Sequence, residues 1–176
     1  MSIQELSAPP HTVGLYSRAI LGAITGKKGS QLPDITLVMR NVAIDRQHLA
    51  AYNRVCGFTQ KETLPVTYPF VLAFPLHMSI ITDARFPFAA MGLVHIRNTI
   101  TQHRPVSASE TLTITVTPAN LRAHDKGQQF DILTTLTTST NEVVWESIST
   151  MLRRGGGGED SGKSSGEKSA AAPKPV

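Results

Sequence analysis

The clearest pattern of apolar and polar positions lies in residues 111–117, which read TLTITVT. Leu112, Ile114 and Val116 alternate with threonines, so one face of an extended chain would be apolar and the other polar. This alternation predicts a β-strand that buries one face against a core.

Three other stretches in the second half of the chain are rich in β-branched residues, and they are 92–101, 130–139 and 143–152. The tetrapeptides 124–127 (HDKG) and 139–142 (STNE) carry the residues that tight turns favour. We therefore expect four antiparallel strands, the last three joined by these turns as a meander, with Trp145 anchoring the sheet.

An earlier segment predicts one strand followed by a short helix. Residues 35–45 (ITLVMRNVAID) have the strand pattern, with an irregularity expected near Asn41. Asp45 can cap a helix over 46–56, and Gly57 suits the left-handed conformation that ends it. The face of this helix that we expect to be buried holds Leu49, Tyr52 and Cys56.

The most apolar segment of the chain is 71–83 (VLAFPLHMSIITD), which follows an expected loop at 58–70. Proline is tolerated in the first turn of a helix but not deep inside one, so Pro75 predicts a helix that begins near Phe74. Asp83 should end it. Because this helix has no clearly polar face, we expect it to be buried.

The predicted order of elements is a strand, a short helix, a buried apolar helix and four antiparallel strands. One apolar helix held against a curved antiparallel sheet is the hotdog architecture, an α+β fold. A sheet that wraps one helix leaves an exposed edge strand, which a second domain or a second copy can cover by pairing with it. We therefore expect this domain to act as one of a pair.

Both ends of the chain differ from the body at residues 35–154, which we predict to be the hotdog domain. Residues 1–34 are weakly patterned and are expected to form an N-terminal arm, with a short helix near 12–24 as one option. Residues 155–176 hold too little apolar surface to offset the entropy of ordering, so we interpret them as a disordered Gly/Ser/Lys-rich tail or linker.

The formal net charge of +4 and the isoelectric point near 9.5 allow an anionic partner. The basic residues form no runs beyond Lys27-Lys28 and Arg153-Arg154, which favours a solvated surface over a nucleic-acid site. The single cysteine, Cys56, excludes an internal disulfide, and no spacing of residues indicates a metal or another cofactor. With no signal-peptide pattern and no apolar run long enough for a membrane span, we expect a soluble cytoplasmic protein.

Three segments carry a family resemblance, and they are 52–58 (YNRVCGF), 64–78 (LPVTYPFVLAFPLHM) and 86–106 (FPFAAMGLVHIRNTITQHRPV). They resemble the MaoC-like acyl-thioester hydratases and dehydratases, most closely the N-terminal hotdog of members that contain two. The likeness extends over roughly residues 35–154, and its most specific part is 68–76.

Active members of this family carry Ser-Gly-Asp-x-Asn-Pro-x-His and, later, Pro-x-x-x-Ala-His-Gly-Met where the central helix opens. The Asp and His together hold a water and move protons, while N–H groups at the helix N-terminus polarise the thioester carbonyl. In this chain Phe58 stands at the position of the Asp, and Phe74-Pro75-Leu76 replaces His-Gly-Met. The resemblance implies that the acid–base pair is missing and that Pro75 removes one N–H from the helix N-terminus.

The two-hotdog members suggest a role for such a half, because their N-terminal domain makes room for a long acyl chain while the second hotdog performs the chemistry. By this resemblance the chain is the acyl-binding half of a (3R)-hydroxyacyl-thioester dehydratase or enoyl-CoA hydratase, inactive alone. Its ligand would be an acyl-CoA or acyl-carrier-protein thioester. The chain would be a free-standing half, one subunit of a split enzyme or a truncated protein. The residues expected to meet the acyl chain are Tyr68, Leu72, Phe74 and Leu76.

Several cations are candidates for binding the phosphates of coenzyme A or of a carrier's phosphopantetheine. We assign this role first to Arg97 and Arg104, with Arg153 and Arg154 as further candidates. His95 and Arg97 should share one face of their strand, because they stand two positions apart.

Two ionisable side chains of the central helix, His77 and Asp83, are the only catalytic candidates, and neither has a partner nearby in the pattern. We interpret His77 as a satisfied core or interface histidine, Asp83 as a helix-terminal residue bonded to the next loop, and Cys56 as a packed thiol. Two alternatives to the dehydratase half are a non-enzymatic acyl-thioester-binding homodimer and a hotdog thioesterase. The thioesterase would need a carboxylate, for which Glu62 and Asp83 are the local candidates.

Overall fold

The computed structural model describes residues 2–10, 14, 15, 17, 19 and 30–155. Residues 14, 15, 17 and 19 are helical, while the rest of the helix expected near 12–24 lies outside the described residues. The predicted tail, apart from Gly155, lies outside them as well.

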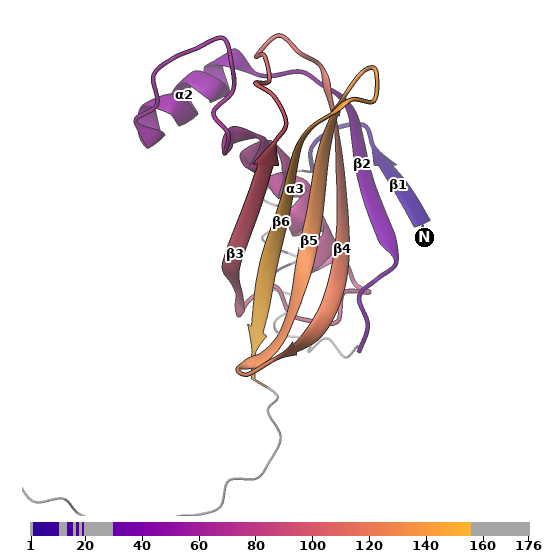
Figure 1. The fold of residues 1–176 in the computed structure, drawn as a ribbon. Helices are drawn as coiled ribbons and strands as arrows, with labels where there is room; N and C mark the ends of the chain where they lie inside the picture. The colour runs from indigo at the N-terminus through magenta and orange to yellow at the C-terminus, as the bar shows by residue number, and fades with distance from the viewer. Residues whose placement is uncertain (1, 11–13, 16, 18, 20–29, 156–176) are drawn as a thin grey trace, which may run out of the picture.

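A six-stranded sheet curves around one helix, as Figure 1 shows. Its strands are β1 (Ser2–Leu6), β2 (Ile35–Val42), β3 (Leu93–Gln102), β4 (Leu112–His124), β5 (Gly127–Thr138) and β6 (Val143–Arg154). They lie in the order β1-β2-β4-β5-β6-β3. β4, β5 and β6 form the predicted meander, and β3 pairs antiparallel with β6. The α+β hotdog fold expected from the sequence is confirmed.

The N-terminal arm contributes a strand that the sequence pattern did not predict. β1 runs parallel to β2, with Ser2 beside Ile35 and Leu6 beside Met39. Its side chains are almost all exposed, and Ile3 is 72% exposed. A strand exposed on both faces lacks the alternation of buried and exposed positions that reveals a strand in sequence. β1 and β3 are therefore the two edges of the sheet.

The central helix α3 (Tyr68–Thr82) is longer than predicted. The prediction that it begins near Phe74 was wrong, and Pro75 lies inside the helix. Pro69 occupies the first turn, where a missing N–H costs nothing. Because apolar side chains around Pro75 are buried in the core, their packing outweighs the hydrogen bond that this proline removes.

The short helix α2 (Arg46–Cys56) has the predicted caps. The Asp45 carboxylate accepts hydrogen bonds from the backbone N–H groups of Gln47 and His48, at 2.8 and 3.1 Å. Gly57 ends the helix in the left-handed conformation, with φ of 72°.

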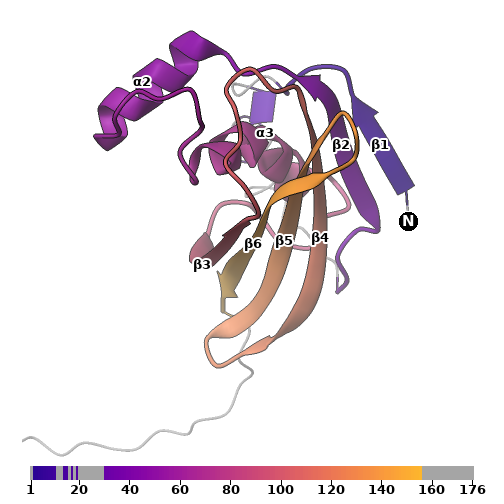
Figure 2. The same ribbon diagram turned by 45° about the horizontal axis from the view of Figure 1, so that its top comes forward.

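Most of the surface of α2 is exposed, because the helix projects beyond the end of β3 (Figure 2). Only Leu49 and Asn53 are buried. Cys56 is exposed, so the interpretation of it as a packed thiol was wrong. The sequence pattern identified the helix but overestimated how much of it the domain covers.

The irregularity expected near Asn41 is confirmed. The pairing of β2 with β4 shifts between Met39 and Val42, and Asn41 has a φ of 56°.

A second irregularity, in β3, was not predicted. His95 pairs with Met151 of β6, but Arg97 pairs with the adjacent Thr150. Neighbouring residues of a strand point to opposite faces, so the bulge turns His95 toward α3 and Arg97 away from it. The prediction that His95 and Arg97 share a face was therefore wrong.

The core lies between the concave face of the sheet and α3. Leu112, Ile114 and Val116 are buried, as their alternation predicted. Trp145 is fully buried, and its indole N–H donates to the carbonyl of Val66 at 2.8 Å. The expectation that Trp145 anchors the sheet is confirmed, because this bond ties β6 to the segment that leads into α3.

Candidate functional site

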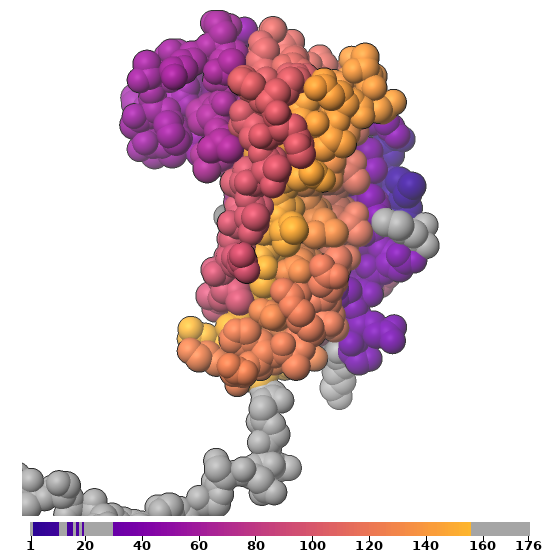
Figure 3. Space-filling model, in the orientation of Figure 1, coloured from indigo at the N-terminus to yellow at the C-terminus, as the bar shows by residue number. Residues whose placement is uncertain are grey.

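The free edge of the sheet at β3 and the adjacent side of α3 bring together several residues that the sequence singled out. Figure 3 shows β3 along one side of the molecule, with α2 projecting above it. The ring centroid of Phe70, on α3, lies 5.3 Å from that of His77 and 5.8 Å from that of His95. The Phe74 ring lies 6.3 Å from Phe70. We call Phe70, Phe74, His77 and His95 the aromatic cluster.

His77 is the buried member of the aromatic cluster, with 4% of its surface exposed. Its Nε2 lies 2.7 Å from Oγ1 of Thr134 on β5. Burial lowers the pKa of His77 to about 4, and the nearby His95 acts in the same direction. His77 is therefore uncharged at neutral pH, and its interpretation as a satisfied core histidine is confirmed.

Asp83 ends α3 and is held by the loop that follows, as predicted. Its Oδ1 accepts a hydrogen bond from the backbone N–H of Arg85 at 2.8 Å. The Arg85 guanidinium donates to Oδ1 and Oδ2 at 2.9 and 3.0 Å. His77 and Asp83 point from different sides of the helix, so the structure gives Asp83 a capping role rather than a place beside His77.

The four residues expected to meet the acyl chain differ in exposure. Phe74 is 41% exposed and Leu72 is half-buried, so both offer surface to a ligand. Leu76 is fully buried in the core. Tyr68 is also buried, and its hydroxyl oxygen lies 2.8 Å from Nδ1 of His48 on α2. Burial raises the pKa of Tyr68 to about 12, so the phenol stays protonated and joins the two helices.

The inner face of β6 next to the aromatic cluster carries hydroxyl groups, which the sequence analysis missed. Ser147 stands opposite Thr134 in the ladder, and the Ser149 hydroxyl donates to Oδ1 of Asn98 at 3.1 Å. The buried Oγ of Ser147 has no hydrogen-bond partner within the described structure. An unsatisfied buried hydroxyl costs about 1–3 kcal/mol, so a polar group bound here would be stabilised. Only the register of the strands reveals this position.

Phe58, which the resemblance sets at the position of the family's catalytic aspartate, lies in the loop after α2. It is 43% exposed, and its ring stacks on Tyr52 with centroids 6.1 Å apart. A cavity of about 350 Å³ is lined by this loop and includes Gly57, Lys61 and Pro65. Phenylalanine carries no ionisable group, so the Phe58 side chain itself cannot transfer a proton.

The expectation that Pro75 removes an N–H from the N-terminus of the central helix was wrong. The helix begins at Tyr68, so the terminal N–H groups lie one to two turns before Pro75. Pro69, in the first turn, is the proline that lacks a donor at that end.

Arg104 is held between two carboxylates rather than free to bind a phosphate. Its guanidinium donates to Glu110 at 2.8 and 3.0 Å and to Glu142 at 2.9 and 3.0 Å. These bonds raise the pKa of Arg104 and lower the pKa values of both glutamates. Arg97, in contrast, is exposed on β3 and makes no ion pair with any described residue.

The described residues hold one close histidine–carboxylate pair, and it lies outside the aromatic cluster. His103 Nε2 is 2.9 Å from Oε2 of Glu146, and the two side chains are 44% and 48% exposed. Both groups are open to water, and neither faces α3.

Within the described ranges, no group of three His, Cys, Asp or Glu side chains is placed to hold a metal ion. No helix in the described part of the chain is long and apolar enough to cross a membrane.

Comparison with known proteins gives one curated relative and several solved structures, while no family model matches the chain. The relative is 3-hydroxyacyl-thioester dehydratase X (HtdX) of Mycobacterium tuberculosis, which is 38% identical over 138 residues. The alignment covers 78% of this chain and 49% of the relative. The chain thus spans about half the length of HtdX.

The solved structures agree with the observed fold. A crystal structure of M. tuberculosis HtdX superposes with a TM-score of 0.64 and 39% identity, over 68% of this chain and 51% of that one. A MaoC-like dehydratase superposes with a TM-score of 0.58 over 69% of this chain and 42% of that one. At 15% identity the second match supports the fold alone. From its hotdog fold and its identity to HtdX, the chain belongs to the MaoC-like dehydratase family.

Proposed function

We propose that this chain is the acyl-binding, non-catalytic half of a 3-hydroxyacyl-thioester dehydratase or enoyl-thioester hydratase. It completes the enzyme by pairing with a second hotdog that carries the acid and the base. The identity to HtdX, a 3-hydroxyacyl-thioester dehydratase of which the chain spans about half, supports the reaction class.

The observation that carries the proposal is Phe58 at the position of the family's catalytic aspartate. Its ring packs on Tyr52 and can neither donate nor accept a proton. The histidine of the central helix, His77, is buried and hydrogen-bonded to Thr134. Dehydration needs one group that removes a proton and one that protonates the leaving hydroxyl, so both groups come from the second hotdog.

The aromatic cluster supplies the surface on which we place the acyl chain. Phe74 is 41% exposed and Phe70 is half-buried, so both keep apolar area that a hydrocarbon can cover. Burying that area stabilises a complex by about 25 cal/mol for each Å² removed from water. The half-buried Leu72 lies on the same helix and extends this surface.

The free edge of β3 is where we place the second hotdog. β3 (Leu93–Gln102) pairs with β6 on one side only, and most of its residues are exposed. An exposed strand edge presents unpaired N–H and C=O groups, which another strand satisfies by extending the sheet. A hotdog paired there brings its own catalytic groups beside the aromatic cluster.

The thioesterase alternative finds no support in the positions of the carboxylates. Glu62 is 80% exposed in its side chain and pairs with Arg46 at 2.9 Å. Asp83 is bound by Arg85. Neither carboxylate faces the aromatic cluster.

The test is an enoyl-CoA hydration assay across acyl lengths with this chain alone, the catalytic hotdog alone and the two together. The catalytic hotdog is one that carries Gly-Asp-x-Asn-Pro-x-His and is encoded beside this chain or later in the same reading frame. We expect no turnover by this chain alone. With the partner, the rate should exceed that of the partner alone, most strongly for long acyl chains.

Enzymatic turnover by the chain alone would overturn the proposal, and His77→Gln and His103→Gln would then locate the responsible group. If the chain leaves the partner's rate unchanged but binds acyl-CoA as a homodimer, it is the non-enzymatic acyl-binding protein instead.

A further inference from the structure

The lysines and arginines of the described residues fall into two groups. The first group is ion-paired with carboxylates and consists of Arg40, Arg46, Arg85, Arg104 and Arg122. The second makes no ion pair with any described residue and consists of Arg54, Lys61, Arg97, Lys126, Arg153 and Arg154. The unpaired cations keep their charge available to a partner.

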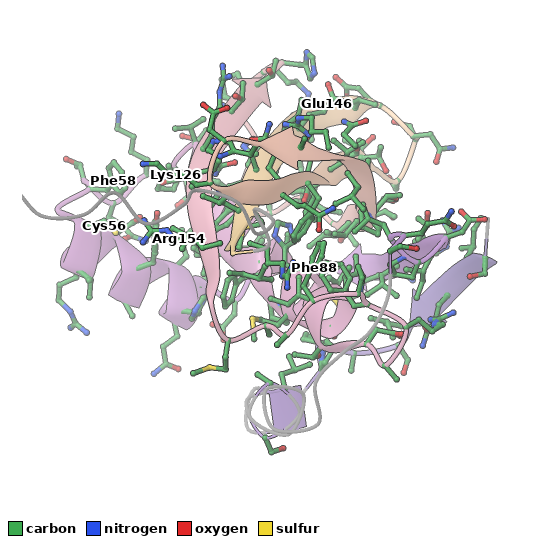
Figure 4. The ribbon with its side chains drawn as sticks, turned by 90° about the horizontal axis from the view of Figure 1, so that it is seen from below. Cys56, Phe58, Phe88, Lys126, Glu146 and Arg154 are labelled. Carbon is green, nitrogen blue, oxygen red and sulfur yellow. The ribbon has the colours of Figure 1, made fainter. Side chains whose placement is uncertain are left out.

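Two of these unpaired cations, Lys126 and Arg154, lie at the same end of the sheet. Lys126 is in the turn between β4 and β5, and Arg154 is the last residue of β6. Arg154 pairs with Gly127 in the ladder of β5 and β6, and Gly127 directly follows Lys126 in the turn. The N–H of Gly155 donates to the carbonyl of Lys126 at 3.3 Å, which holds the end of β6 against the turn. Seen from below in Figure 4, Lys126 and Arg154 lie close together.

Two further unpaired cations lie between this pair and the free edge of the sheet, one on each face of the sheet. Arg153 stands opposite Leu93 at the start of β3, and Arg97 lies farther along that strand. The Arg153 guanidinium lies over the ring of Phe88, 5.4 Å from its centroid, so its position is fixed by packing. We call Arg97, Lys126, Arg153 and Arg154 the basic end.

Among the described residues, carboxylates do little to offset the basic end. Asp131 on β5 is already bound by Arg122 at 2.9 and 3.1 Å, by Asn120 at 3.0 Å and by Thr150 at 2.7 Å. Asp125 in the turn is the other carboxylate in the segments 93–98, 119–131 and 149–155 that build this end. Counted over these described segments, the surface has a net positive charge.

The shape of the basic end favours a protein partner over a small phosphate. Lys126 and Arg154 are exposed at a turn and a strand end, and Arg97 is exposed on an edge strand. Four cavities among the described residues, of about 190 to 470 Å³, are lined by other side chains. A small ligand binds tightly in a concave site, whereas a spread of exposed cations complements the acidic face of a protein.

We propose that the basic end docks the acidic face of an acyl carrier protein, which delivers its acyl group to the aromatic cluster. This inference rests on the proposed function, and it selects a protein-bound thioester over coenzyme A. Strand β3 links the two places, because Leu93 pairs with Arg153 while His95 belongs to the aromatic cluster. Two residues of an extended strand span about 7 Å, so the acyl surface begins next to the docking surface.

The test compares two charge-reversal variants of the full chain. The double variant Lys126→Glu/Arg154→Glu changes the basic end and leaves Arg153 packed on Phe88. The control, Arg54→Glu/Lys61→Glu, reverses two unpaired, exposed cations on α2 and the loop after it. Each variant loses two positive charges and gains two negative ones, so both change the formal net charge from +4 to 0.

Binding of an acyl carrier protein that carries a saturated acyl group is measured for each variant, beside binding of the same acyl group as its coenzyme A thioester. We expect the Kd for the acylated carrier to rise about tenfold or more in the basic-end variant and to stay within twofold in the control. Raising the salt concentration should weaken carrier binding to the unaltered chain and have less effect on the basic-end variant. Binding of the coenzyme A thioester should be the same in all three.

Equal carrier binding by the three proteins, or an equal loss in both variants, would overturn the inference while leaving the proposed function intact. A parallel loss of coenzyme A binding in the basic-end variant alone would also overturn it, by assigning the cations to the coenzyme's phosphates. If the unaltered chain binds neither thioester, that result overturns the proposed function and, with it, the inference that rests on it. Thermal unfolding of each variant confirms that it is folded.

Discussion

The imidazole Nε2 of His77 lies 2.7 Å from the hydroxyl oxygen of Thr134, and this contact ties the buried side of α3 to the middle of β5. By the resemblance, the catalytic histidine of active members belongs to the Asn-Pro-x-His motif, whereas His77 lies on the central helix. Here the helical histidine is buried and uncharged, and its ring supports Phe70, which faces the free edge. A histidine of this kind serves packing, and its effect should appear in the pH dependence of stability.

The stability of the domain should fall as the pH drops from about 6.5 to about 4, because His77 has a pKa near 4 in the folded state and an ordinary pKa of 6.5 when unfolded. Within that window the unfolded chain binds a proton that the folded chain excludes, so protons favour unfolding. The contribution is fully present above pH 6.5 and is lost toward pH 4, on the order of 3 kcal/mol in total.

Urea unfolding at several pH values measures this dependence. His77→Gln should flatten the slope in this window, because it removes the group whose pKa differs between the folded and unfolded states. An unaltered slope in the His77 variant would show that another group accounts for the pH dependence.

Replacing Pro75 with alanine should stabilise the domain. Proline has no N–H, so the bond from residue 75 to the carbonyl of Val71 cannot form, and alanine restores it. Part of the gain is offset because alanine makes the unfolded chain more flexible, which leaves about 1–2 kcal/mol. Pro69→Ala, in the first turn where no donor is needed, should give no gain. Chemical unfolding checks both, and a loss of stability in Pro75→Ala would mean that the proline ring itself packs favourably.

Replacing Asp131 with alanine should destabilise the domain by about 2–4 kcal/mol. Burial alone would raise the pKa of Asp131, but hydrogen bonds from Arg122, Thr150 and Asn120 outweigh it and hold the pKa below its ordinary value. The carboxylate is 7% exposed, so its loss leaves several donors without an acceptor. This stabilisation is present at neutral pH and lost as the pH falls through the lowered pKa. Asp125→Ala, in the exposed turn, is the control and should shift stability by less than about 0.5 kcal/mol.

Local chemistry explains what the sequence predicted well. The cap at Asp45, the left-handed Gly57 and the alternation at 111–117 each depend on neighbouring residues alone. The start of α3 also depends on packing against distant residues. The burial of its apolar side chains in the core outweighs the hydrogen bond that Pro75 removes. A local rule for proline therefore placed the helix boundary too late.

Contacts between distant segments account for the part of the site that the sequence did not predict. The partners of Arg104 include Glu142, which is 38 positions away. The bulge that separates His95 from Arg97 appears only when β3 is paired with β6. The resemblance to the family identified Phe58, but the hydroxyl of Ser147 required the three-dimensional register.

Arg104→Gln should lower the midpoint of thermal unfolding without changing acyl-thioester binding. The guanidinium joins Glu110 to Glu142, so its loss leaves two neighbouring carboxylates without a shared cation. Arg104→Lys keeps the charge but not the paired geometry, and it should restore only part of the midpoint. A weaker affinity for acyl-CoA at unchanged stability would return Arg104 to the role of phosphate ligand that the sequence suggested.

Phe74→Asp tests whether the aromatic cluster receives the acyl chain. The ring is 41% exposed, so the substitution should destabilise the domain by less than the roughly 3–5 kcal/mol lost when a fully buried phenylalanine is removed. It places a carboxylate on the surface assigned to hydrocarbon, so the Kd for a long-chain acyl-CoA should rise about tenfold or more. Val55→Asp introduces the same charge at an 85% exposed position on α2 and should leave binding unaltered. Isothermal titration with acyl groups of increasing length separates the effects, because a loss caused by the acyl surface grows with chain length. A loss equal for short and long chains would place the damage at the thioester or the coenzyme, and the acyl surface would then lie elsewhere on the domain.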